Sequence, residues 1–126
     1  MTAALLLLPL LACKKAPPAN TMTVRAAEAA LVGVWREDAG MTATIAKAGG
    51  GVEVVSLVDY DGEVFTVDGA GWESDGFTVR YTVPSTSYAV TLRVTDIQEE
   101  TLLFDWSNVT PDGGANQGNG YLKRVE

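Results

Sequence analysis

The chain has 126 residues, with 9 Lys and Arg against 16 Asp and Glu for a net charge of −7, and it holds one Cys and no His. This length predicts a single domain. One Cys excludes an internal disulfide and a Cys-rich metal site, and the usual general base and nucleophile pairs need His. Because binding to duplex DNA depends on neutralised phosphates, an acidic chain binds nucleic acids poorly. We therefore expect a protein without enzyme activity that binds no cofactor, metal ion or nucleic acid.

An apolar run of ten residues, Ala3–Ala12, precedes the single Cys13. It is too short to span a bilayer as a helix, which needs about 20 residues, but it has the length of a signal-peptide core. The alternative is a buried strand or helix with Cys13 as an ordinary buried thiol. The next stretch, Lys14–Thr21, is basic and Pro-rich without apolar periodicity, which is typical of a flexible tether.

The end of the run, Leu10-Leu11-Ala12-Cys13, resembles the lipobox of bacterial lipoproteins. The resemblance implies that residues 1–12 are a signal peptide and that Cys13 becomes the lipidated N-terminus. Residues 13–22 would then tether a domain of residues 23–126 to a membrane of the bacterial cell envelope. Lys14 after the Cys implies, by the same resemblance, the outer membrane, with the domain facing the periplasm.

The folded part opens with strong helix formers over residues 24–31, which Thr23 can cap and Gly33 ends. Apolar and polar residues then alternate with a period of two, which is typical of half-buried strands. The expected strands are Val34–Glu37, Met41–Lys47, Val52–Tyr60, Glu63–Val67, Phe77–Val83, Tyr88–Ile97, Thr101–Val109 and Tyr121–Val125.

The segments between these strands are short and rich in turn residues, among them Asp68–Gly71, and Pro111–Asn119 is the one long loop that we expect. Turns this short leave no room for crossover helices, so neighbouring strands should pair antiparallel. We predict an all-β fold, a single antiparallel meander of about eight strands closed into a small barrel after a short N-terminal helix. A β-sandwich is the alternative.

The segment Gly33-Val34-Trp35, which opens the first strand after the helix, resembles the Gly-x-Trp signature of the lipocalin and calycin barrels. The resemblance implies that Trp35 closes the base of the barrel. It also implies that a basic residue near the C-terminus, here Arg124, packs across the Trp35 ring as a cation–π contact. About 100 residues make a lipocalin-like barrel short, which leaves little room for a large cavity.

Six aromatic residues are candidates for a ligand pocket at the mouth of this barrel, and the alternative is that they fill its core. They are Trp72, Phe77, Tyr81, Tyr88, Phe104 and Trp106. Carboxylates cluster in the turn Asp59–Glu63, where Ca²⁺ could bind, although we favour a solvated hairpin. Arg80 and Arg93 lie on polar strand faces, which we expect to face solvent rather than an inward anion pocket.

These features favour a membrane-anchored, non-enzymatic binding module for a small apolar or amphipathic ligand at the barrel mouth. The alternative is a filled barrel that binds or inhibits another envelope protein. An interior cavity of roughly 300 Å³ or more would favour the ligand, and a filled core would favour the protein partner.

Overall fold

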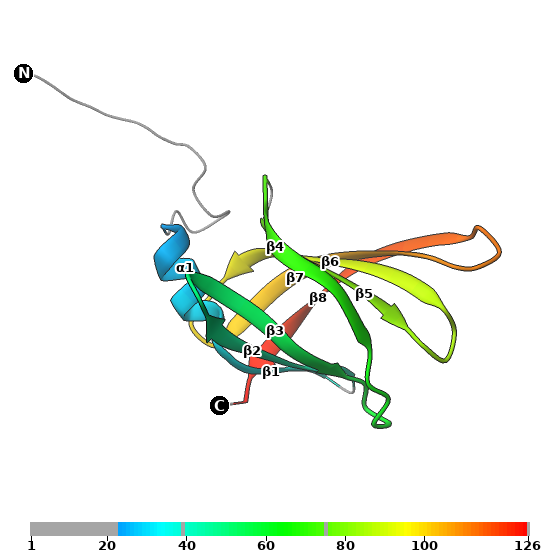
Figure 1. The fold of residues 1–126 in the computed structure, drawn as a ribbon, viewed down its shortest axis with the longest axis horizontal. Helices are drawn as coiled ribbons and strands as arrows, with labels where there is room; N and C mark the ends of the chain where they lie inside the picture. The colour runs from blue at the N-terminus through cyan, green and yellow to red at the C-terminus, as the bar shows by residue number, and fades with distance from the viewer. Residues whose placement is uncertain (1–22, 39, 75, 126) are drawn as a thin grey trace, which may run out of the picture.

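The computed structural model describes residues 23–38, 40–74 and 76–125. This part of the chain holds one helix and one antiparallel sheet (Figure 1). In chain order the elements are α1 (Val24–Leu31), β1 (Gly33–Glu37), β2 (Thr42–Ala48), β3 (Gly51–Val58), β4 (Thr66–Glu73), β5 (Gly76–Val83), β6 (Tyr88–Ile97), β7 (Thr101–Val109) and β8 (Ala115–Arg124).

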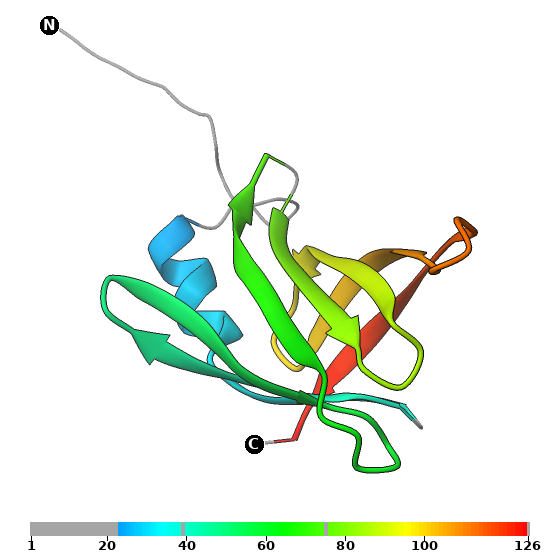
Figure 2. The ribbon, with the colours of Figure 1, turned by 45° about the vertical axis from the view of Figure 1, so that its right-hand side comes forward.

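The strands follow the order β3-β2-β1-β8-β7-β6-β5-β4, so each strand pairs with its neighbour in the chain except at one place. The first and last strands also pair, with Trp35 opposite Arg124, which nearly closes the meander into a barrel. Between β3 and β4 the pairing is reduced to one isolated bridge, from Val58 at the end of β3 to Val64 before β4, and beyond it the two strands diverge (Figure 2). The predicted fold class is confirmed, and the sandwich alternative is wrong.

Strand β4 corrects the sequence prediction, which ended the fourth strand at Val67 and expected a turn at Asp68–Gly71. The strand instead runs over Thr66–Glu73, with a bulge between Val67 and Gly69. It stays attached to β5 because apolar partners hold both of its ends, where Val67 lies opposite Tyr81 and Trp72 lies opposite Phe77. The glycines between those ends are tolerated because pairing with β5 satisfies the backbone.

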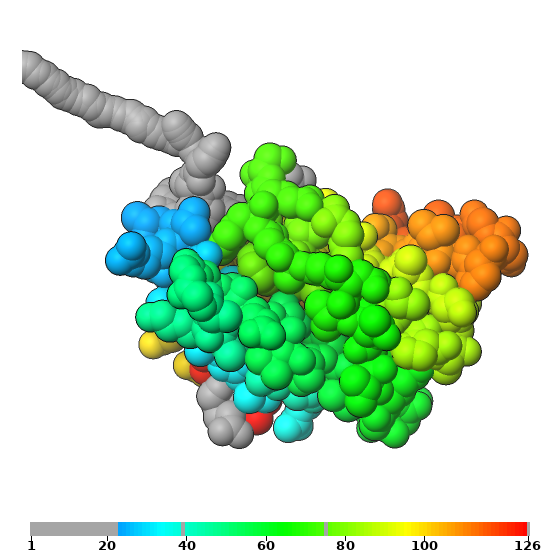
Figure 3. Space-filling view, in the orientation of Figure 1, coloured from blue at the N-terminus to red at the C-terminus, as the bar shows by residue number. Residues whose placement is uncertain are grey.

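Strand β8 is the second correction, because the predicted loop Pro111–Asn119 is mostly strand. The connection shrinks to a tight turn in which the Thr110 amide donates to the Gly114 carbonyl at 2.9 Å. Gly113 has a φ of +91° there, which favours glycine. Pairing with the long β7 therefore outweighs the weak strand propensity of this polar stretch, and the β7–β8 hairpin projects beyond the rest of the barrel (Figure 3).

Helix α1 covers one end of the barrel, which we call the closed end. Thr23 caps the helix, its hydroxyl accepting from the Ala26 amide at 3.1 Å, and Ala27 and Leu31 are its buried residues. The opposite end, where the turns after β1, β3, β5 and β7 lie, we call the mouth. Between the two ends, one continuous cluster of apolar side chains fills the interior.

Candidate functional site

The closed end is built around Trp35, which is fully buried. The Arg124 guanidinium carbon lies 4.2 Å from the centroid of the Trp35 ring, the contact that the calycin resemblance implied. Arg124 also donates from Nη1 to the Val32 carbonyl at 2.9 Å and from Nη2 to the Ala30 carbonyl at 2.8 Å. These carbonyls end α1 and lack helical partners, so one side chain holds the helix, β1 and β8 together.

Two of the six candidate aromatics also belong to the closed end. Trp72 and Phe77 meet edge to face, with their ring centroids 5.3 Å apart. The Trp72 indole Nε1 donates to Glu28 of α1 at 3.0 Å, which ties β4 to the helix. These two rings therefore pack beneath α1, and the structure does not bring them to the mouth.

The mouth contains a half-open cavity of about 210 Å³. Its walls include three of the candidate aromatics, Tyr81, Phe104 and Trp106, and its lining is completed by Met41, Val90, Leu92, Glu37 and Asn108. The sixth candidate, Tyr88, is half-buried and packs against the same core. The cavity thus has apolar walls with a carboxylate and an amide among them.

Sequence reasoning missed Glu37 and Asn108 as mouth residues, although the period-two pattern held a signal for both. Trp35 points inward, so Glu37, two residues further along β1, lies on the same face. Asn108 likewise shares a face of β7 with Phe104 and Trp106. Polar residues of a half-buried strand usually face solvent, whereas each of these two lies where its strand reaches the mouth.

The electrostatics of the mouth follow from burial and from nearby carboxylates. Burial raises the pKa of Tyr81 to about 12, and the negative charges of Glu37 and Asp59 act in the same direction. The Tyr81 phenol is therefore neutral near pH 7, and its ring stacks on Phe65 with the centroids 5.2 Å apart. In the described part of the chain, Glu37 is the one charged residue that lines this cavity.

The acidic turn between β3 and β4 lies at the edge of the mouth. One carboxylate oxygen from each of Asp59, Asp61 and Glu63 lies within 4.8 Å of the others. Each also accepts a local hydrogen bond, Asp59 from the Tyr60 amide, Asp61 from the Glu63 amide, and Glu63 from the amide and hydroxyl of Ser85. These bonds organise the turn and hold it to the β5–β6 connection.

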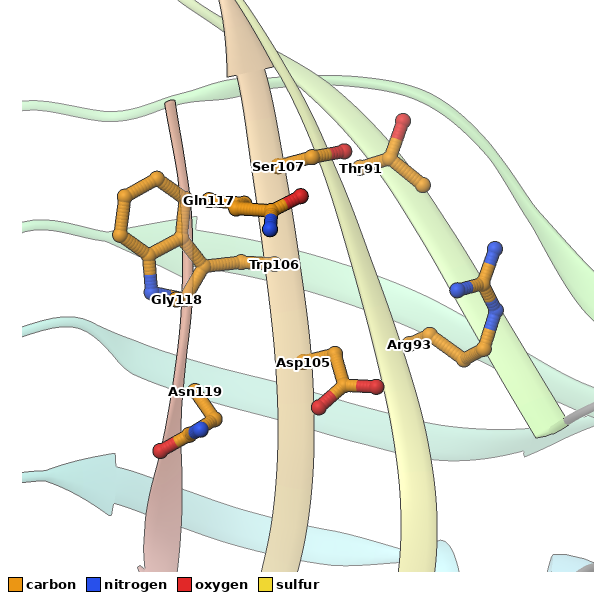
Figure 4. Close-up of a pocket in the computed structure, with 8 residues that line it drawn as sticks. All are labelled: Thr91, Arg93, Asp105, Trp106, Ser107, Gln117, Gly118 and Asn119. Atoms are coloured by element: carbon orange, nitrogen blue, oxygen red, sulfur yellow. The ribbon is translucent and has the colours of Figure 1, made fainter. Parts of the chain in front are cut away.

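A larger, polar groove of about 450 Å³ lies on the outer face of β6, β7 and β8 (Figure 4). Strand register places its side chains in two rows, Arg93–Asp105–Asn119 and Thr91–Ser107–Gln117. Figure 4 shows Arg93 directed away from Asp105. The β8 members were missed because their stretch of sequence was expected to be a loop.

The outer face of β5 carries Arg80, whose guanidinium binds Glu73 of β4 at 2.7 Å. Arg80 is exposed, and its pKa is raised by the hydrogen bond and the charge of Glu73. Arg80 and Arg93 thus lie on the outside of the barrel, as expected, and they do not form an anion pocket inside it.

In comparisons with known proteins, no protein-family model, no curated protein and no solved structure matches the chain. Within the described residues, α1 is much shorter than a membrane span, and no helix there is long and apolar enough to cross a bilayer. Cys13 and the lipobox lie outside the described residues.

Proposed function

We propose that this chain is a non-enzymatic binding module of the bacterial cell envelope, anchored by a lipid on Cys13, which takes a small apolar or amphipathic ligand at the barrel mouth. The observation that carries the proposal is the half-open cavity of mixed lining, in which six apolar or aromatic side chains surround two polar ones, Glu37 and Asn108. Such a combination suits a ligand with one apolar and one polar end.

The size of the cavity restricts the ligand. Pockets for drug-sized molecules usually hold about 300–1,000 Å³, and the mouth cavity holds about 210 Å³. The cavity is below the roughly 300 Å³ that would favour a ligand inside the barrel, and the interior behind Phe104 and Leu92 is filled. The proposal is therefore limited to a small molecule, or the apolar end of a larger one, held at the mouth alone.

The proposed anchor and the mouth fit together in space. A tether over residues 13–22 would join the domain at α1, which covers the closed end. The mouth would then lie at the opposite end of the domain from the point where the tether joins it. Replacing Cys13 with Ser and expressing the chain in a bacterial host tests the anchor, because unchanged mass and membrane fractionation would rule out lipidation.

Thermal unfolding of the full chain with short-chain fatty acids, alcohols and apolar dyes tests the mouth. A ligand at 100 times its Kd should stabilise the fold by about 2.7 kcal/mol, which is several degrees for a domain of this size. Val90→Phe fills the cavity and should abolish the shift. Ala89→Phe is the matched control, since Ala89 is exposed on the other face of β6 and should leave the shift intact.

The second candidate is a filled-barrel module that binds or inhibits another envelope protein. The observation in its favour is the continuous apolar core, which leaves a mouth cavity smaller than the usual range for ligand pockets. If no small molecule shifts the unfolding transition and affinity capture recovers one envelope protein, this candidate replaces the first.

A further inference from the structure

Negative charge gathers at the mouth of the barrel around a cavity of mixed polar and apolar lining. Glu37 lines the cavity itself. Across the mouth, the turn that carries Asp59, Asp61 and Glu63 is held against the β5–β6 connection by the bonds from Ser85. A charged group that enters the cavity therefore meets the Glu37 carboxylate, while the carboxylates of the β3–β4 turn lie at the edge of the mouth.

Positive charge lies elsewhere among the described residues. Arg124 is engaged at the closed end, and Arg25 and Lys47 line a separate groove between α1 and the β2–β3 turn. Arg80 binds Glu73 on the outer face, and Lys123 lies 5.8 Å above the Tyr121 ring. The remaining two, Arg36 and Arg93, point to the outside of the sheet, and no Lys or Arg of the described residues lines the mouth.

We propose that the mouth selects cationic ligands, in which a protonated amine lies next to a small aromatic or short alkyl group. This inference rests on the proposed function of the mouth and adds the sign of the ligand's charge. The carboxylate of Glu37 would pair with the amine, while the rings of Tyr81 and Trp106 would hold the apolar group. Aromatic faces also attract cations, so the same walls favour both parts of such a ligand.

An anionic ligand of the same shape would be rejected for the same reason. A carboxylate in the cavity would lie beside Glu37 without a compensating cation, and like charges at short range repel strongly where water is partly excluded. The neutral phenol of Tyr81 can donate a hydrogen bond to such a ligand but supplies no positive charge.

The test compares three ligands that share a phenyl ring and differ in charge: phenethylamine, phenethyl alcohol and 3-phenylpropionate. Each is titrated into the full chain near neutral pH at low salt, and binding is followed by NMR at the indole of Trp106. We expect the amine to bind at least about tenfold more tightly than the carboxylate, a difference that added salt reduces.

Glu37→Gln should weaken amine binding several-fold and leave the alcohol unchanged, because Gln keeps the acceptor that faces the Met41 amide at 3.4 Å. Glu53→Gln is the matched control, since it removes the same charge from an exposed position at the start of β3, away from the mouth. Equal effects of the two variants would overturn the inference.

The outcomes separate the inference from the proposed function. If the alcohol and the carboxylate bind at the mouth as tightly as the amine, the mouth is a binding site without charge selectivity, and the inference is wrong. If none of the three perturbs the Trp106 indole, the proposed function of the mouth fails with it.

Discussion

Arg124 stacks its guanidinium on the Trp35 indole at 4.2 Å and donates to the carbonyls of Ala30 and Val32 from the same group. The Trp35 Nε1 in turn donates to the Leu31 carbonyl at 2.8 Å. Three successive carbonyls at the end of α1 thus accept hydrogen bonds from two side chains instead of from water. This arrangement ties the end of α1 to β1 and β8 at the closed end of the barrel.

Replacing Arg124 with Met tests this arrangement. Met keeps much of the apolar stem but leaves the Ala30 and Val32 carbonyls without their donors, and unpaired buried groups cost about 1–3 kcal/mol each. We expect Arg124→Met to lower the free energy of unfolding by about 2–4 kcal/mol, measured by urea denaturation. Lys123→Met, at the exposed neighbouring position, should change it by less than about 0.5 kcal/mol. Similar losses in both variants would contradict a specific role for Arg124.

Thr78 offers a stabilising substitution. Its side chain is 1% exposed although it points to the outer face of β5, and its hydroxyl has no hydrogen-bond partner. Val has the same shape without the hydroxyl, so Thr78→Val should raise the free energy of unfolding by about 1 kcal/mol.

Thr82 is the control for that substitution, because it lies on the same face of β5 and its hydroxyl donates to Asp68 at 2.7 Å. We expect no stabilisation from Thr82→Val, since the change removes an existing bond. A midpoint of thermal unfolding that rises in both variants would show that strand propensity, and not the buried hydroxyl of Thr78, is the cause.

The sequence predicted the helix and most strands because their apolar residues alternate clearly, as in β5 and β6. It failed at β4 and the first half of β8, where Gly, Asn and Gln carry little strand propensity and pairing with a neighbour decides. The division of the aromatics between the two ends could not be predicted either. Trp72 and Trp106 look alike in the sequence, and only strand register places one beneath α1 and the other at the mouth.

Gly118 is expected to be needed for the shape of the mouth. A Cβ at this position would lie 2.9 Å from the Trp106 indole, so Gly118→Ala must displace the ring. We expect a loss of about 1–3 kcal/mol in the free energy of unfolding and a shift of the Trp106 fluorescence.

Gly71→Ala serves as the comparison, because a Cβ on that residue of β4 meets nothing within 4 Å. Gly71→Ala should leave the free energy of unfolding unchanged or raise it by up to about 1 kcal/mol, because Ala lowers the conformational entropy of the unfolded chain. If Gly118→Ala is as harmless as Gly71→Ala, the indole does not pack on β8 as the structure shows.

The Tyr81 phenol predicts how stability falls at alkaline pH. Burial, with the charges of Glu37 and Asp59, raises its pKa to about 12 from the ordinary tyrosine value of about 10. The folded state holds this proton more tightly than the unfolded state does. The stability that depends on the protonated Tyr81 is therefore fully present below about pH 10 and is lost as the pH rises through 12. Two pKa units correspond to roughly 2–3 kcal/mol.

Tyr81→Phe should therefore remove a part of the decline in unfolding free energy between about pH 10 and 12, measured by denaturant titration at each pH. Tyr121→Phe is the control, since Tyr121 is 43% exposed and should leave the decline unchanged. Tyrosinate absorbance gives a direct check, because the folded chain should hold the Tyr81 proton to about pH 12, and Tyr81→Phe should remove that late part of the titration. If Tyr81→Phe leaves the late part of the titration of the folded chain unchanged, Tyr81 is open to water and the mouth is wider than the structure shows.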